Sequence, residues 1–136
     1  MLQEKVDDDA CRHEEYRDPA LRVTLLPRDT NKHGTIFGGI ILSHIDLAAA
    51  VQARKTCGPY NFVTVAMDKI VFHKPAFLGD LVSFYTETVR VGHTSITIKI
   101  EVEATRADSQ ETVSVTEAEV LFVAVDKDWK PTPIKK

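Results

Sequence analysis

The chain of 136 residues has 43% hydrophobic and 27% charged residues, which is typical of one ordinary globular domain. Its net charge of -3 and its pI of about 5.9 argue against a general nucleic-acid-binding protein, because such proteins usually carry a basic face. No apolar run approaches the roughly 20 residues that span a membrane, and the N-terminus lacks a signal-peptide core. Cys11 and Cys57 have neither metal-type nor redox-type spacing, so the expected location is a reducing cytoplasm.

The first part of the chain contains a charged tail, a short strand and one long apolar segment. Residues 1–18 are rich in Asp, Glu, Arg and Lys without periodicity, which predicts a flexible acidic tail. Residues 21–26 have the pattern of a short strand, and a turn-rich loop follows. Residues from about 38 to 56 are apolar almost all round, which predicts a buried helix that ends before the Gly-Pro pair at 58–59.

After this helix the hydrophobic period changes to two, which predicts four long strands. They are expected over residues 62–72, 81–91, 94–105 and 112–125. Short turns between the last strands imply an antiparallel meander, and one central helix with one curved sheet wrapped around it is an α+β fold. The exposed sheet edges favour dimerisation by edge pairing, and residues 127–136 predict an irregular C-terminal tail.

A carboxylate within the apolar helix is the first functional candidate. If the helix begins at Gly38 or Gly39, Asp46 lies about two turns inside it, where an apolar neighbourhood would suit a general base or a nucleophile. The glycines would let a ligand approach the first N–H groups of the helix closely. A structural interpretation stays open, because Ser43 and Asp46 also have the spacing of a capping box.

Three further polar residues near this helix have ordinary structural explanations as well. Asn31 lies in the loop before the helix, where asparagine most often forms a turn. His33 and His44 could act as ligands or bases, but no Cys, His or Asp spacing around them is typical of a metal site. The sequence therefore predicts that no metal is bound.

A series of motifs along the chain resembles the signature of the hotdog-fold acyl-CoA thioesterases, in particular the YciA-like broad-range acyl-CoA hydrolases. The matching segments are Asp29-Thr30-Asn31, Gly34, Ile36-Phe37-Gly38-Gly39, Asp46, Val63-Thr64-Val65-Ala66, Phe72-His73-Lys74-Pro75, Gly79-Asp80, Val91-Gly92-His93-Thr94-Ser95-Ile96 and Phe122-Val123-Ala124-Val125-Asp126. The series implies one hotdog domain over residues 19–126 and leaves both tails outside it.

The resemblance also implies a function and a set of site residues. Proteins of this kind hydrolyse acyl-CoA thioesters to a free acid and CoA, without a cofactor beyond the CoA of the substrate. Asp46 matches the catalytic carboxylate, Asn31 a supporting residue from the partner chain, and Gly39 the N–H donor to the thioester carbonyl. The positions expected to border the substrate are Gly38, Phe72, Arg90, Thr94 and Ser95. The expected assembly is a homodimer with sites at its interface, which further associates as a trimer of dimers.

Three other interpretations share parts of this pattern. A hotdog dehydratase or hydratase would have the same fold, but it pairs a His with an acid beside a His-Phe-Pro-type segment, which does not precede this helix. A non-catalytic acyl-CoA-binding module would normally carry a DNA-binding helix pair, and residues 1–18 are too short and too acidic for one. A plain interaction domain, with Asp46 as a capping residue, also stays open.

Overall fold

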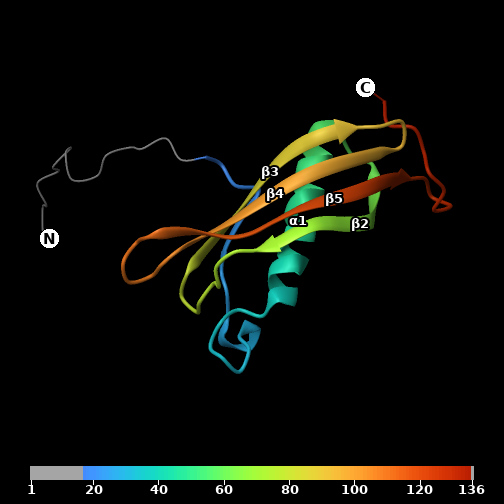
Figure 1. Cartoon of the computed structure of the whole chain (residues 1–136). Coiled ribbons are helices and arrows are strands. Elements are labelled where there is room, and N and C mark those ends of the chain that lie inside the picture. Colours follow the sequence, from blue (N-terminus) through green and yellow to red (C-terminus); the bar gives the residue numbers. More distant parts are fainter. Residues whose placement is uncertain (1–16, 136) are drawn as a thin grey trace, which may run out of the picture.

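A computed structural model describes residues 17–135 as one helix packed on a curled sheet (Figure 1). The elements are β1 (Leu21–Thr24), a short 3-10 helix η1 (Pro27–Asp29), α1 (Gly38–Cys57), β2 (Asn61–Phe72), β3 (Leu81–Val91), β4 (Ser95–Thr105) and β5 (Thr112–Val125). The predicted α+β fold with one long helix and four long strands is therefore confirmed.

The five strands form one antiparallel sheet in the order β1-β3-β4-β5-β2. The expected meander holds for β3, β4 and β5, which pair with their sequence neighbours. β2 departs from the meander, because it pairs with β5 and not with its neighbour β3, and it forms one edge of the sheet. The turn at residues 75–80 consequently crosses from one side of the sheet to the other (Figure 1).

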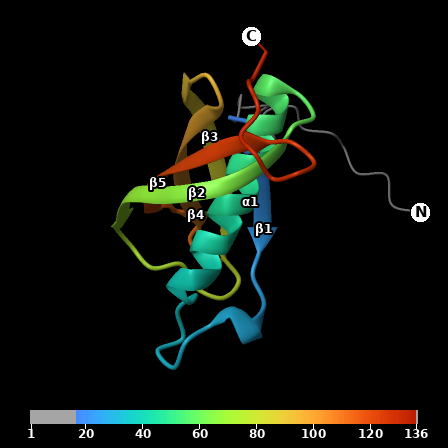
Figure 2. The same cartoon turned by 90° about the vertical axis from the view of Figure 1, so that its right-hand side faces the viewer.

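The hydrophobic core lies between α1 and the concave face of the sheet (Figure 2). Every second residue of β4 enters it, as its alternation predicted, and these positions are Ile96, Ile98, Ile100, Val102 and Ala104. The helix contributes Ile41, Ile45, Ala48, Ala49 and Ala53. Small alanines in the second half of the helix let its backbone approach the sheet closely.

The expectation that α1 is buried all round is wrong for the single chain. Leu47 and Val51 lie on its outer face and remain 59% and 40% exposed. One sheet covers only one side of a helix, so the apolar residues of the other side stay in contact with solvent. This outer face, defined by Leu47 and Val51, needs a partner for its burial.

The first strand is shorter than predicted, because Leu25 and Leu26 leave the sheet after Thr24. Residues 25–37 form a segment, called the site loop below, that contains only η1 as regular structure. Its end is tied to its start by the Phe37 N–H group, which donates to the Asp29 carbonyl over 2.8 Å. The loop therefore folds back on itself before α1 begins.

The segment after β5 is irregular in backbone but bound to the domain. Thr132 and Ile134 donate N–H groups to the carbonyls of Ala124 and His93, each over 2.8 Å. The Ile134 side chain is buried in the hydrophobic core. The part of this segment that the structure describes consequently helps to cover one end of the sheet.

Candidate active site

The N-terminus of α1 presents two glycine N–H groups. Ile40 and Ile41 donate to the Phe37 carbonyl, while the Gly38 and Gly39 N–H groups have no acceptor among residues 17–135. The first N–H groups of a helix lack intrahelical partners and carry the positive end of its dipole. They can therefore bind an oxygen on which negative charge develops.

Glycine at position 39 has a local reason in the side chain of Phe37. A Cβ atom on Gly39 would lie 2.5 Å from Cε1 of the Phe37 ring, which is closer than real Cβ contacts come. On Gly38, a Cβ atom would lie 3.5 Å from the Phe72 ring, which is ordinary contact. The structure thus brings Gly38 and Phe72 together, as expected for two residues that border one site.

Asp46 lies about 11 Å further along α1 than Gly39, at a rise of 1.5 Å per residue. Its side chain is half-buried rather than enclosed by apolar groups, and Oδ1 accepts a 2.7 Å hydrogen bond from the Thr64 hydroxyl of β2. Thr64 is a site residue that the sequence pattern does not predict. A hydroxyl between the apolar residues of 62–66 does not indicate which group it will bind.

The capping-box interpretation of Ser43 and Asp46 is wrong. The helix begins at Gly38 with Phe37 as its N-cap, five residues before Ser43. The Ser43 hydroxyl donates to the Ile40 carbonyl over 2.8 Å, and the Asp46 carboxylate is bound by Thr64. Asp46 is therefore available for a role other than helix initiation.

Asn31 organises the site loop around itself. Its Nδ2 donates to Thr35 Oγ1 over 2.8 Å, and its Oδ1 accepts the N–H groups of His33 and Thr35 at 2.9 and 3.3 Å. This matches the turn-forming role that asparagine often has. Among the described residues no hydrogen bond joins Asn31 to Asp46, so a single protomer does not bring these two side chains into direct contact.

An apolar cavity of about 310 Å³ lies beside the start of α1. Its lining residues are Ile36, Gly38, Ile41, Phe72, His73, Lys74, Pro75, Ala76 and Val115. Most of this lining is aliphatic or aromatic, and a lysine and a histidine belong to it as well. The cavity can accept an apolar chain next to the glycine N–H groups.

The other expected substrate residues lie at the opposite end of the sheet. Phe72 pairs with Thr116 of β5, which in turn pairs with Val102 of β4. Ser95 lies seven residues before Val102 on β4, so about 23 Å of strand separate these two residues. Thr94 precedes Ser95 in the β3–β4 turn, and exposed Arg90 lies near the end of β3. The register therefore separates Arg90, Thr94 and Ser95 from the helix N-terminus within one chain. The β3–β4 turn and the start of α1 lie far apart in Figure 1.

Histidines and cysteine do not form a second catalytic centre in the described part of the chain. His44 Nδ1 lies 2.8 Å from the Ile40 carbonyl, and its ring stacks on Phe84. Burial raises the pKa of the Cys57 thiol, which lowers its thiolate fraction at neutral pH.

Residues 17–135 contain no group of three or more potential metal ligands. No helix among them is long and apolar enough to cross a membrane.

Comparison with known proteins gives a consistent family assignment. The model of the thioesterase superfamily matches residues 33–109. The chain is 38% identical over 117 residues to the acyl-CoA thioester hydrolase YciA of Salmonella typhimurium, covering 84% of this chain and 87% of that protein.

Solved structures agree with this assignment. A hexameric hotdog-fold thioesterase of Campylobacter jejuni superposes with a TM-score of 0.82 at 48% identity, covering 88% of this chain and 91% of that chain. A hexameric broad-specificity acyl-coenzyme A thioesterase superposes with a TM-score of 0.81 at 36% identity, covering 91% of this chain and 85% of that chain. The resemblance inferred from the motifs is confirmed: the chain belongs to the thioesterase superfamily and has the hotdog fold.

Proposed function

We propose that this protein hydrolyses acyl-CoA thioesters to a free acid and CoA. The observation that carries the proposal is a carboxylate, Asp46, on the same helix as the unoccupied N–H groups of Gly38 and Gly39. These groups supply the two things that thioester hydrolysis needs, a base or nucleophile and an oxyanion donor. Relatives at 36–48% identity are named acyl-CoA thioester hydrolases or thioesterases, which supports the substrate class.

The reaction uses each of these groups once. The Gly39 N–H group donates to the thioester carbonyl oxygen and stabilises its developing charge by about 3 kcal/mol. Asp46 removes a proton from water, the resulting hydroxide bonds to the carbonyl carbon, and the C–S bond breaks to release CoA thiolate, which is then protonated. In a second route Asp46 attacks the carbon directly, the C–S bond breaks to release CoA thiolate, and water hydrolyses the resulting mixed anhydride to the free acid and Asp46. Single-turnover hydrolysis in heavy-oxygen water distinguishes the two routes, because heavy oxygen from water enters the Asp46 carboxylate only in the second route.

The substrate has two chemically different parts, and the chain offers a region for each. The apolar cavity beside Gly38 and Phe72 suits the acyl chain. Arg90, Thr94 and Ser95 carry the polar groups that suit the CoA arm, with the Arg90 guanidinium as a phosphate ligand. No metal or dissociable cofactor takes part in these steps, so chelation of metal ions should leave the activity unchanged.

The proposed active unit is a homodimer with two shared sites, further associated as a trimer of dimers. β2 is a sheet edge whose Val65 is 56% exposed, and antiparallel pairing with a second β2 would extend the sheet. Such pairing about a two-fold axis places the Asn61 end of one β2 beside the Phe72 end of the other. Asp46, beside Thr64 of one chain, would then act with the helix start and Asn31 of the partner subunit.

The direct test is hydrolysis of palmitoyl-CoA and short acyl-CoAs, followed with a thiol reagent, for wild type and Asp46→Asn. We expect the variant to keep its fold and lose activity by about 10²-fold or more, as for loss of a general base. Glu87→Gln, which neutralises an exposed carboxylate on β3, is the matched control and should retain activity. A folded Asp46→Asn protein with wild-type turnover would contradict the catalytic assignment. Hydration of an enoyl-CoA without hydrolysis would instead indicate a hydratase.

Shared sites are tested by mixing two variants of strongly reduced activity. Under conditions that exchange subunits, Asp46→Asn and Asn31→Ala chains form mixed dimers in which one site carries both lesions and the other carries neither. Random exchange makes half of the dimers mixed, so activity should recover to about a quarter of wild type. If mixed dimers form and activity stays at the level of either variant, the sites are not shared.

A further inference from the structure

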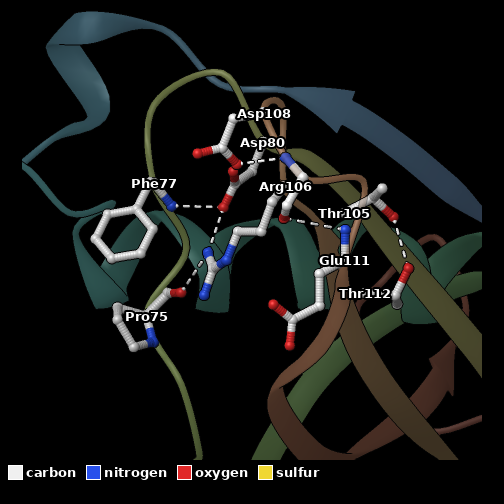
Figure 3. A network of polar contacts seen from close by, with 9 residues as sticks. Pro75, Phe77, Asp80, Thr105, Arg106, Asp108, Glu111 and Thr112 are labelled. Carbon is white, nitrogen blue, oxygen red and sulfur yellow. Dashed lines mark hydrogen bonds and ion pairs between the residues drawn. The ribbon is translucent and has the colours of Figure 1, made fainter.

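A buried ion pair joins the β4–β5 hairpin to the turn before β3 (Figure 3). Arg106 follows the last residue of β4, and Asp80 precedes β3. Their side chains are only 15% and 4% exposed, and Arg106 Nη1 lies 2.5 Å from Asp80 Oδ2. Removing one partner of a pair this well shielded from water strongly destabilises the folded protein, because the other charge stays buried without compensation.

The remaining contacts of this pair close the turn at residues 75–80. Arg106 Nη1 also donates to the Pro75 carbonyl over 3.0 Å, and the guanidinium lies 4.6 Å from the centre of the Phe77 ring. Asp80 Oδ2 accepts the Phe77 N–H group over 2.9 Å, and the Asp80 N–H group donates back to the Phe77 carbonyl over 3.1 Å. Because Arg106 is engaged by three groups of its own chain, it is a structural cation rather than a free ligand for a phosphate.

The turn at 75–80 in turn holds the site loop. Ile36 donates its N–H group to the Ala76 carbonyl over 2.8 Å, and Thr35 forms an antiparallel bridge with Phe77. Thr35 is also the residue that binds the Asn31 side chain and backbone, with two of these bonds at 2.8 Å. A short series of hydrogen bonds therefore leads from Arg106 through the turn to Asn31.

The site loop depends on this support, because it has little regular structure of its own. Its residues 35 and 36 immediately precede Phe37 and the start of α1. A displacement of the 75–80 turn would therefore move both Asn31 and the helix N-terminus relative to the sheet. A shift of about 1 Å in such groups can reduce a reaction rate by about 10²-fold.

We propose that Arg106 and Asp80 are positioning residues, which fix Asn31 and the start of α1 in the geometry that the reaction needs. This inference rests on the proposed thioesterase function, since it assigns a role within the same site. Neither side chain touches the reacting atoms, and both act through the 75–80 turn. Loss of the pair consequently lowers kcat through Asn31 and the start of α1, and it also loosens Pro75 and Ala76, which line the cavity beside Gly38.

The kinetic test is a double-variant cycle between Arg106→Met and Asn31→Ala. Alone, Arg106→Met should lower kcat about 10- to 100-fold. In the Asn31→Ala background the same substitution should lower kcat several-fold less than in wild type, because one of the two groups that it positions is already absent. Thr105→Val is the matched control, since it removes the Thr105–Thr112 hydrogen bond of the same hairpin, which does not reach the turn (Figure 3).

Hydrogen exchange provides a second readout that needs no activity. Peptides covering residues 31–36 should exchange faster in Arg106→Met than in wild type and Thr105→Val, while β3 and β4 keep their protection. If Arg106→Met does not fold, Arg106→Lys replaces it, because the ammonium keeps the charge opposite Asp80 and loses the planar guanidinium that lies over the Phe77 ring.

Each outcome decides the inference. Faster loop exchange together with a kcat effect that is several-fold smaller in Asn31→Ala supports positioning. An equal kcat loss in both backgrounds, or unchanged exchange at residues 31–36, overturns it and leaves Arg106 a purely stabilising residue. If wild type hydrolyses no acyl-CoA, the proposed function fails separately, and the exchange data alone decide whether the pair fixes the loop.

Discussion

The two oxygens of Asp46 have different surroundings, and this difference assigns them different tasks. Oδ1 is bound by the Thr64 hydroxyl, whereas Oδ2 has no hydrogen-bond donor within residues 17–135. A carboxylate held by one oxygen cannot rotate freely, so the other oxygen keeps a constant direction towards water or substrate. Thr64 is therefore the residue that orients the proposed base.

We expect Thr64→Val to lower kcat about 10-fold or more, since a hydrogen bond to a charged group contributes roughly 1.5–3 kcal/mol. Thr64→Ser keeps the hydroxyl and should stay close to wild type. Steady-state kinetics on one short and one long acyl-CoA measure both variants. Unchanged kcat in Thr64→Val would mean that the bond has no part in catalysis.

A side chain at position 39 should disturb the helix N-terminus through Phe37. In Gly39→Ala the new methyl group would lie 2.5 Å from the Phe37 ring, so the ring or the helix start must move. We expect at least a 10-fold loss of kcat/KM and recovery of most of it in the Gly39→Ala, Phe37→Ala double variant. Lack of recovery would show that the methyl group itself blocks the N–H donor.

At the scale of the elements, α1 has one face for the core and one for a partner. Its outer face carries Leu47 and Val51, and beyond it β2 is an open sheet edge. Leu47→Glu places a charge on this face, and we expect the protein to sediment as a monomer and to lose activity with its assembly. Val89→Glu, at a similarly exposed apolar position on β3, is the control and should keep the dimer. A dimeric, active Leu47→Glu protein would exclude this face from the interface.

Local patterns predict elements better than they predict neighbours. The bounds of β3 and β5 agree with the alternation of the sequence, and α1 begins at the glycines that were expected to start it. The place of β2 beside β5 was not predictable in the same way, because a period of two identifies the faces of a strand and not its partners. Leu25 and Leu26 have strand-like composition, but the return of the site loop takes them out of the sheet.

The same distinction applies to the site. Asp46 was predictable as a polar group in an apolar helix, and Gly39 as a glycine at the helix start. Thr64 was not, because its role depends on the contact between α1 and β2, which are brought together only by folding. Arg106 belongs to the same class, since nothing local in its hairpin indicates that it reaches Pro75 and Asp80.

At the scale of the whole molecule, the proposed CoA-binding residues lie at the end of the sheet away from Phe72 and the start of α1. Exposed Arg90 should therefore matter only for substrates that carry the phosphates of CoA. We expect Arg90→Ala to raise KM several-fold for an acyl-CoA and to leave it unchanged for the same acyl group on N-acetylcysteamine, which has no phosphate. An equal effect on both thioesters would place Arg90 outside the CoA arm.

Because the outer face of α1 is exposed in the single chain, the stability of this protein should depend on its concentration. If Leu47 and Val51 are covered only in the assembly, folding and association share one equilibrium, and mass action governs both. Each tenfold dilution then removes about 1.4 kcal/mol from the association free energy of a dimer. The melting temperature should fall steadily across a dilution series, and an enzyme stock that is stable when concentrated should lose activity with time at assay concentration.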